Sequence, residues 1–422
     1  MTFDEVRDEI LKKGKFATRS GFEIFSELQV LLENPAHNMN IIHVAGTNGK
    51  GSTVAFISSI LKAAGFCVGR YTSPHLVSVC ERIALDSEAI SENDFVVYGT
   101  KILEICRQNN LEVTSLDILL GIALLYFDDC HCDYVILETG MGGTNDSTNA
   151  IDTIPLVSVI TRIGMDHTQY LGTDIASITQ EKAGILKKGT HAVFAQNDTL
   201  ISHLLQQRAQ QLDIEYIDLT NAPENIASAM HGEKLGLLGM YQFENAQSAV
   251  CCVLILFELS HKSNSKLWNI WEKTNLKECI HQGLMNVTWP GRMQIVSKNP
   301  WVMVDGAHNP QGVLALVHSL SILYPQEKFI FVTGIFADKD HGTMIKEIVP
   351  YVYELYVTSM DEKRYVSAEE LYQEALSNHI PCKIYASLDE AIVKAKESAL
   401  RQNIKCIVFG SLALVGIFEK EE

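Results

Sequence analysis

The sequence has no run of basic residues. Lys and Arg number 34 against 51 Asp and Glu in 422 residues, so the formal net charge is −17. A nucleic-acid surface needs clustered Lys and Arg to neutralise the phosphate backbone, so this balance argues against a nucleic-acid partner. A small anion can still be bound, because local cations and backbone N–H groups can hold it against an unfavourable overall field.

Segments that would export the chain or anchor it in a membrane are not recognisable either. Residues 1–16 mix charged and apolar residues and lack the basic, apolar and small-residue zones of a signal peptide. The most apolar stretch, residues 116–127, is too short to span a bilayer and contains Asp117, so it predicts a buried core helix. We therefore expect a cytoplasmic protein with no membrane partner.

No Cys-x-x-Cys pair occurs among the ten cysteines, and many of them lie inside apolar runs. This pattern is typical of reduced core residues rather than of disulfides or a zinc site. Hydrophobic residues make up 47% of the chain and charged residues 20%, which is ordinary for a globular protein. The length allows two or three domains.

What the sequence does contain is a repeated order of short apolar run, turn and helical stretch. Apolar runs that alternate with helices predict a parallel sheet covered on both faces. The first series of predicted strands is residues 39–46, 133–140, 154–164 and 191–195, with helices expected over 52–65, 175–186 and 199–212.

A second series begins after Pro290 and Gly291. Its predicted strands are residues 301–306, 328–334, 353–359, 382–386 and 405–410, each followed by a helical segment. Five strands at this spacing predict a separate, smaller α/β domain. We therefore expect an α/β protein with one domain over 1–291 and a second over 292–422.

The segment GTNGKGST, residues 46–53, follows the first predicted strand and opens a helix. Its glycines let consecutive N–H groups face an anion, the helix N-terminus adds a partial positive charge, and Lys50 supplies a mobile cation. The spacing differs from the standard nucleotide loop, because only Thr47 and Asn48 separate Gly46 from Gly49. The alternative is an ordinary glycine-rich turn between strand and helix.

Polar residues also follow other predicted strands. Glu138 ends a buried run, where a carboxylate is costly unless it binds a cation or caps the next turn. The Ser-Pro-His at 73–75 is a turn whose hydroxyl suits Mg²⁺, and Arg82 could meet a carboxylate. By residue type alone, His167 is a hydrogen-bonding group and Lys182 a surface lysine.

These motifs together resemble the folylpolyglutamate synthase and dihydrofolate synthase family of the Mur ligase superfamily. The segments that carry the resemblance are GTNGKGS at 46–52, TSPHL and ERI within 72–83, ETGMGG and D-x-T-N within 138–149, DH and LG within 166–172, the helix start at 239–246, DGAHNP at 305–310 and GS at 410–411. They occur in the family's order and span nearly the whole chain. The resemblance implies the Mur ligase architecture, a P-loop-type parallel sheet domain followed by a smaller Rossmann-like domain.

Site residues are also implied by this resemblance. Nucleotide binding is implied for Gly46, Thr47, Asn48, Gly49, Lys50, Gly51, Ser52, Thr53, Asn245, Arg292, Asp305 and His308. Two magnesium ions are implied, with Ser73, Glu138 and His167 as ligands, and catalytic roles for Lys50, His167 and a Lys182 carboxylated by CO₂. Substrate contacts are implied for Pro74, His75, Arg82 and Ser411. By residue type alone, Asn245 could instead cap a helix, and Ser411 could end a strand in a turn.

The sequence departs from the family pattern at three places. Thr144 and Asn145 replace the commoner Arg and Leu, Tyr241 replaces a histidine, and Leu116 with Asp117 stands where members usually have Phe-Glu. The last departure bears on the pteridine or folate pocket.

The activity implied is an ATP-dependent ligase that adds L-glutamate to a folate or to dihydropteroate through an acyl phosphate. We expect a monomer. A cell-wall Mur ligase shares the loop and the two domains, and a catalytically silent ATP-binding module would share the loop alone. TSPHL and DGAHNP favour the folate branch.

Overall fold

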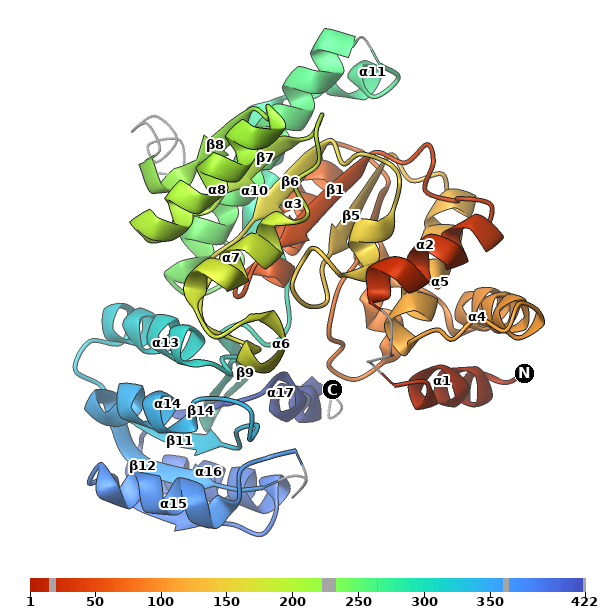
Figure 1. Ribbon diagram of the computed structural model, residues 1–422. Helices are drawn as coiled ribbons and strands as arrows, with labels where there is room; N and C mark the ends of the chain where they lie inside the picture. The colour runs from red at the N-terminus through yellow and green to blue at the C-terminus, as the bar shows by residue number, and fades with distance from the viewer. Residues whose placement is uncertain (15–19, 222–232, 264, 360–363, 420–422) are drawn as a thin grey trace. The chain divides into compact units, whose positions relative to one another are not determined.

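The computed structural model describes residues 1–14, 20–221, 233–263, 265–359 and 364–419 (Figure 1). Contacts divide the chain into two compact units. Unit 1 comprises Met1–Gly236 and Phe243–Val287, and unit 2 comprises Leu237–Gln242 and Thr288–Glu422.

Unit 1 is built on an eight-stranded sheet of order β4-β3-β2-β5-β1-β6-β7-β8. The strands are β1 (Ile41–Ala45), β2 (Val68–Tyr71), β3 (Ile83–Leu85), β4 (Glu88–Ala89), β5 (Tyr134–Glu138), β6 (Val157–Ile160), β7 (His191–Phe194) and β8 (Tyr216–Asp218). From β2 to β8 all neighbours are parallel, whereas β3 and β4 add an antiparallel edge. The inner strands β1, β5 and β6 are buried along their whole length.

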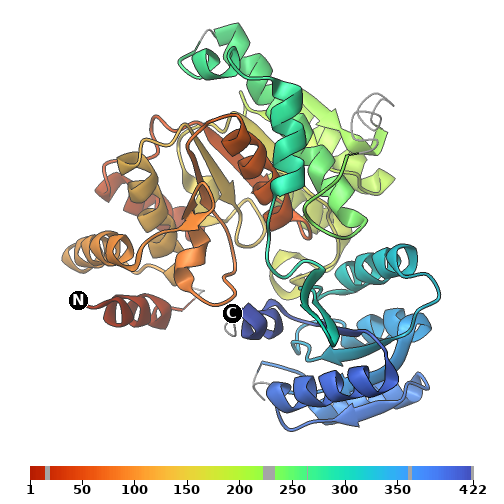
Figure 2. The ribbon, with the colours of Figure 1, turned by 180° about the vertical axis from the view of Figure 1, so that it is seen from behind.

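Helices cover both faces of this sheet, as expected for parallel strands. The helices are α1 (Phe3–Lys12), α2 (Gly21–Leu31), α3 (Lys50–Ala63), α4 (Glu92–Gln108), α5 (Ser115–Asp129), α6 (Thr168–Leu171), α7 (Ile175–Ala183), α8 (Thr199–Leu212), α10 (Tyr241–Ser263), α11 (Trp268–Trp271) and α12 (Leu276–Asn286). Figure 1 shows α2, α5 and α7 on the near face, and Figure 2 shows α3, α10 and α12 on the other. Gly283 of α12 lies directly against the backbone of Ile60 in α3.

Two apolar helices bear on the question of a membrane. The predicted core helix is α5, which is 15 residues long and buried over most of its length. Among the described helices, only α10 is long and apolar enough to cross a bilayer, and 56% of its most apolar window is buried inside the protein. A core helix of a globular protein passes the same test.

Unit 2 contains a six-stranded sheet of order β13-β12-β11-β14-β10-β9. The strands are β9 (Gln294–Lys298), β10 (Trp301–Val304), β11 (Phe329–Thr333), β12 (Val352–Val357), β13 (Cys382–Ile384) and β14 (Cys406–Phe409). The helices are α13 (Pro310–Leu323), α14 (His341–Ile348), α15 (Ala368–Ser377), α16 (Leu388–Gln402) and α17 (Leu412–Glu419). All pairs are parallel except β9 with β10.

The predicted fold class is confirmed: two α/β units, each with a mainly parallel sheet. Every strand predicted in the second series is present, and β9 is an additional edge strand. The short 3₁₀ turns are η1 (Val79–Arg82), η2 (Ser147–Ala150), η3 (Leu219–Asn221) and η4 (Val349–Tyr351). All ten cysteines are free thiols.

Candidate functional site

The glycine-rich loop lies between the end of β1 and the start of α3, at the carboxyl edge of the sheet. Gly49 is the N-cap of α3 and has a φ of 88°, a conformation that favours glycine. A Cβ on Gly46 would lie 1.8 Å from Thr161 Oγ1, and one on Gly49 would lie 2.3 Å from Asn245 Oδ1. Both glycines are therefore required by close neighbours, and the N-terminus of α3, which begins directly after Gly49, suits an anion.

Residues just after β6 hold the loop through its backbone. The N–H groups of Thr47 and Asn48 both donate to the carbonyl oxygen of Arg162, at 2.9 and 3.1 Å. The Thr161 hydroxyl donates to the carbonyl oxygen of Asn48 at 2.8 Å. These hydrogen bonds join the loop to the end of β6.

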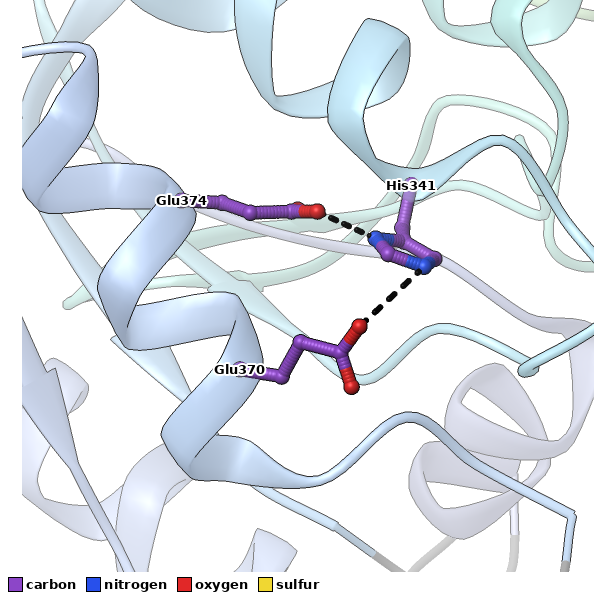
Figure 3. Close-up of side chains that lie close together, drawn as sticks. All are labelled: His341, Glu370 and Glu374. Atoms are coloured by element: carbon purple, nitrogen blue, oxygen red, sulfur yellow. Dashed lines mark hydrogen bonds and ion pairs between the residues drawn. The ribbon is translucent and has the colours of Figure 1, made fainter.

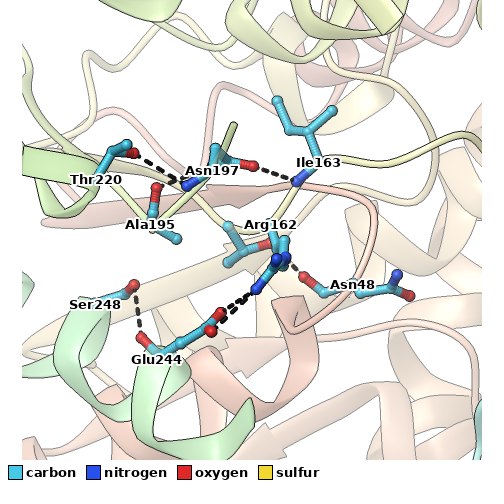
Figure 4. A network of polar contacts seen from close by, with 9 residues as sticks. Asn48, Arg162, Ile163, Ala195, Asn197, Thr220, Glu244 and Ser248 are labelled. Carbon is cyan, nitrogen blue, oxygen red and sulfur yellow. Dashed lines mark hydrogen bonds and ion pairs between the residues drawn. The ribbon is translucent and has the colours of Figure 1, made fainter. Parts of the chain in front are cut away.

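Arg162 also joins the loop to α10, as Figure 4 shows. Its Nη1 donates to both carboxylate oxygens of Glu244, at 3.0 and 2.9 Å. The next residue, Asn245, is 7% exposed and contacts Gly49. Asn245 is the fifth residue of α10, so the helix-cap interpretation is wrong.

Two lysine side chains converge on one carbonyl oxygen of the loop. Lys50 Nζ donates to Gly46 O at 3.0 Å, and Lys182 Nζ donates to the same oxygen at 2.9 Å. Lys182 is only 4% exposed. Burial, together with the charge of Lys50, lowers the pKa of Lys182 to about 7. The interpretation of Lys182 as an ordinary surface lysine is therefore wrong.

Glu138 ends β5, beside the strand that leads into the loop. It is 3% exposed, and in the sheet it is paired with Val44 of β1. Its Oε2 accepts a hydrogen bond from the backbone N–H of Ser73 at 3.1 Å, so Ser73 and Glu138 lie next to each other. The next turn is not capped by Glu138: its N–H groups, of Gly140 and Met141, donate to Asp146.

The donor set here fits a hard cation. Carboxylate and hydroxyl oxygens are the ligands that Mg²⁺ prefers. The buried hydroxyls of Thr53, at the start of α3, and Thr139, which follows Glu138, find no hydrogen-bond partner in the described ranges of the chain. Buried hydroxyls without partners are costly, so they suit a ligand or ordered water.

His167 lies in the loop that follows β6, on the other side of β1. It is exposed, has a φ of 50° and is the N-cap of the short helix α6. Its backbone N–H donates to Asp166 Oδ1 at 2.8 Å.

The segment predicted to meet the substrate follows β2. Arg82 is buried, and its Nε donates to His75 Nδ1 at 2.9 Å. Arg82 Nη1 is also buried and has no acceptor within the described part of the protein. Because a buried guanidinium nitrogen without an acceptor is costly, this atom fits a substrate carboxylate. Pro74 lies between Ser73 and His75 in the same turn.

Asp117, one of the departures from the family pattern, has a structural role. Its Oδ2 accepts from the N–H and the hydroxyl of Thr114, which caps α5, and its Oδ1 accepts from Ser147. The residue therefore joins the start of α5 to η2.

Three of the predicted nucleotide residues, Arg292, Asp305 and His308, belong to unit 2. Asp305 Oδ2 accepts from the Tyr241 hydroxyl at 2.9 Å and from the Met293 N–H at 2.8 Å. Burial raises the pKa of Asp305, and the nearby Arg292 opposes this. His308 Nδ1 lies 2.8 Å from Gly306 O, so this nitrogen carries the hydrogen.

Ser411 is fully buried in unit 2. Its hydroxyl accepts from the N–H of Leu414 and lies 3.1 Å from the Tyr365 hydroxyl. These contacts are those of a residue that starts a helix, here α17. Its predicted contact with substrate stays a prediction.

A second set of metal-type side chains occurs in unit 2 and includes no predicted site residue. His341 Nδ1 lies 2.6 Å from Glu374, and His341 Nε2 lies 3.9 Å from Glu370 (Figure 3). The two nitrogens face different carboxylates, and a metal ion would bind only one of them. The arrangement is that of a histidine between two ion-pair partners.

Comparison with known proteins identifies the family of this chain. The family described as Mur ligase middle domain matches residues 44–253, and Mur ligase, glutamate ligase domain, matches residues 291–412. A dihydrofolate synthase/folylpolyglutamate synthase of Bacillus subtilis is 31% identical over 439 aligned positions, covering 99% of this chain and 98% of that protein. The chain belongs to this ligase family.

Solved structures of family members have the same fold. The folylpolyglutamate synthase of Mycobacterium tuberculosis complexed with ADP superposes with a TM-score of 0.87 at 26% identity, covering 99% of this chain and 98% of that one. The bifunctional enzyme of Yersinia pestis, complexed with AMPPNP and a Mn ion, gives 0.83 at 27% identity, with 100% and 98% covered.

Sequence reasoning missed several residues that hold this ligase site together. Thr161, Arg162 and Glu244 position the loop and α10 through contacts between segments up to 113 residues apart. His43, a polar residue inside an otherwise apolar strand, was a signal that could have been followed. It contacts Thr148 of the D-x-T-N motif.

Proposed function

We propose that this chain is an ATP-dependent ligase that adds L-glutamate to a folate, as a folylpolyglutamate synthase, a dihydrofolate synthase or both. The single observation that carries the proposal is the loop at 46–53, where Lys50, the N-terminus of α3 and the buried acid Glu138 of the neighbouring strand lie at one edge of the sheet. Family membership supplies the reaction, and this geometry supplies the groups for it.

In this proposal the γ-phosphoryl group of ATP passes to a folate carboxylate and gives an acyl phosphate. The amine of glutamate then attacks, and inorganic phosphate leaves. The N–H groups at the N-terminus of α3 and Lys50 bind the phosphates and oppose the charge that develops during transfer. Asn245, fixed against Gly49, presents its amide for the adenine base. Little acid–base chemistry is needed, because the leaving group is already activated.

Ser73, Glu138 and His167 are proposed to hold two magnesium ions, with Thr53 as a further oxygen donor. Bound Mg²⁺ would supply electrostatic stabilisation of the transferring phosphoryl group. Glu138 and Ser73 are already in contact, so part of the ligand set is preformed. His167 approaches from the strand on the other side of β1.

Lys182 is proposed to be carboxylated. Reaction with CO₂ needs an uncharged amine, and a pKa of about 7 leaves a large fraction of Lys182 uncharged at neutral pH. The carbamate would carry a negative charge, which would relieve the crowding of two cations at Gly46 O.

Domain 1–291 is proposed to bind ATP and the folate, with Arg82, His75 and Pro74 on the folate side. Domain 292–422 is proposed to bind glutamate, with Ser411 on that side, while Arg292, Asp305 and His308 serve the nucleotide. We propose a cytoplasmic monomer.

The test is ADP release by the purified protein with ATP, Mg²⁺ and glutamate, supplied in turn with dihydropteroate, tetrahydrofolate and a UDP-muramoyl peptide. We expect turnover with one or both pteridines and none with the peptide. Turnover with the peptide alone would identify a cell-wall ligase. ATP binding without glutamate-dependent ADP release would identify a silent binding module.

Variants then connect the activity to the loop. Lys50→Ala should lower kcat by roughly a thousandfold, because a cation that stabilises the transferring group is worth several kcal/mol. Lys62→Ala is the matched control, since Lys62 is an exposed lysine near the other end of the same helix. Near-normal turnover of Lys50→Ala would remove its proposed role.

A further inference from the structure

A chain of buried polar groups joins the strand that precedes the loop to the turn that follows Glu138. His43 lies in the middle of β1 and is 1% exposed. Its Nε2 lies 2.8 Å from Thr148 Oγ1, and Thr148 Oγ1 lies 2.6 Å from Asp146 Oδ1. The other carboxylate oxygen, Asp146 Oδ2, accepts from the N–H groups of Gly140 and Met141, at 2.9 and 3.0 Å.

The direction of these hydrogen bonds can be worked out from the donors available. An ionised Asp146 can only accept, so the single hydroxyl hydrogen of Thr148 points to Asp146. Thr148 Oγ1 must then accept from His43, which therefore carries its hydrogen on Nε2. Burial lowers the pKa of His43 to about 3, so the ring is neutral at working pH and has this one tautomer.

Asp146 itself is a strong anchor. Besides the two turn N–H groups it accepts from the Thr148 N–H at 3.0 Å, so four donors converge on one carboxylate. Burial raises its pKa, and these hydrogen bonds oppose the rise. A buried carboxylate that accepts a full set of hydrogen bonds holds the donor groups in place. Loss of one donor leaves a buried charge partly unsatisfied, which costs free energy.

This series of buried polar groups lies next to the phosphate loop and to Glu138. His43 is three residues before Gly46, and Gly140 is two residues after Glu138. β1 and β5 are hydrogen-bonded neighbours, so backbone pairing already sets the distance between their middles. Backbone pairing between these strands ends with Glu138 opposite Val44 and with the Thr139 N–H, which donates to Val44 O at 2.9 Å. The next two N–H groups, of Gly140 and Met141, donate to Asp146 instead, so the polar link through Thr148 holds the turn directly after the metal-binding acid.

We infer that His43 is a positioning residue: as a neutral Nε2–H donor it holds Thr148 and Asp146, and through them it sets where Glu138 presents its carboxylate to a divalent cation beside the phosphate loop. This inference rests on the proposed function. It assigns to His43 no contact with substrate. It predicts that loss of the donor weakens metal binding more than nucleotide binding.

The experiment measures the affinity for AMPPNP by calorimetry, with and without Mn²⁺. The metal effect is the dissociation constant without Mn²⁺ divided by the dissociation constant with Mn²⁺. In His43→Leu this ratio should fall on the order of 10-fold to 100-fold, as for other residues that orient metal ligands. Affinity for AMPPNP alone should stay within about twofold, because the N-terminus of α3 and Lys50 are untouched. His43→Gln, whose amide can donate at a similar reach, should restore most of the ratio.

A second pair guards against misfolding of His43→Leu. Thr148→Val removes the relaying hydroxyl at nearly constant volume and should reproduce the loss, whereas Thr148→Ser keeps the hydroxyl and should not. On the wild type, ¹⁵N-histidine spectra should show the His43 hydrogen on Nε2, with no titration from pH 5 to 9.

The outcomes separate the two proposals. A hydrogen on Nδ1, an unchanged metal ratio in both His43→Leu and Thr148→Val, or an equal loss in His43→Gln would overturn the role of His43. If the wild type binds AMPPNP with no metal effect at all, the proposed function fails, and this inference fails with it.

Discussion

Lys182 is a buried amine whose ionisation differs between the folded and unfolded chain. Its pKa falls from 10.5 to about 7 on folding. Below pH 7 the folded protein holds a costly buried charge, and between pH 7 and 10.5 the unfolded chain binds more protons than the folded one. By linkage, this residue's contribution makes the free energy of unfolding rise with pH across that window, by about 1.4 kcal/mol per pH unit.

Lys182→Met should therefore be more stable than the wild type at pH 7, and the difference should shrink as the pH approaches 10. Urea unfolding at pH 7, 8.5 and 10 measures this, with Lys188→Met as the control for an exposed lysine nearby. A difference independent of pH would show that Lys182 is not buried in its charged form. Addition of bicarbonate, if Lys182 is carboxylated, should stabilise only the wild type.

At this scale the sequence located Lys50 and Glu138, because both follow an apolar run that predicts a buried strand. It could not predict the state of Lys182. Lys182 Nζ donates to Gly46 O, 136 residues away in the chain, and residue spacing within one segment carries no information on such a contact.

Among the elements, α3 has a glycine with positive φ at each end, and these two glycines form a natural pair for experiment. Gly49 has a φ of 88°, and a Cβ there would lie 2.3 Å from Asn245 Oδ1. Gly65 has a φ of 91°, and a Cβ there would meet nothing within 4 Å. Gly49→Ala adds the same backbone strain as Gly65→Ala and also displaces Asn245.

We expect both alanine variants to lose roughly 1 kcal/mol of stability from the strained backbone. Only Gly49→Ala should weaken ATP binding strongly, by tenfold or more, because the Asn245 side chain, proposed to face adenine, must move away from residue 49. Thermal unfolding and fluorescence titration with an ATP analogue give the two quantities. Equal ATP affinity in the two variants would contradict the packing of Asn245 on Gly49.

The inner strands were predictable because parallel strands buried on both faces are continuous apolar runs. The strands β3, β4, β8 and β9, at or next to the sheet edges, were not predicted. β4 has two residues, both exposed, and β9 has exposed or half-buried residues throughout, so neither carries a clear apolar signal. The pairing of Arg162 with Glu244 likewise follows from the three-dimensional fold, since 82 residues separate them.

At the scale of the whole molecule, the charge of −17 on 47.0 kDa opposes self-association. We expect sedimentation equilibrium to give the mass of one chain in 50 mM and in 500 mM NaCl. Saturating AMPPNP with Mn²⁺ should leave the mass unchanged while raising the melting temperature, since a ligand at 100 times its dissociation constant adds about 2.7 kcal/mol. A mass of two chains at either salt concentration would contradict the prediction of a monomer.

The six residues Leu237–Gln242 belong to unit 2, although the chain on both sides of them belongs to unit 1. A gene fragment that starts at Thr288 would encode the whole six-stranded sheet but would leave Asp305 without the Tyr241 hydroxyl. A fragment that ends at Val287 would carry that hexapeptide with nothing to pack it. No single cut in the polypeptide therefore yields two intact halves, and dissecting this protein by truncation requires a permuted or grafted chain.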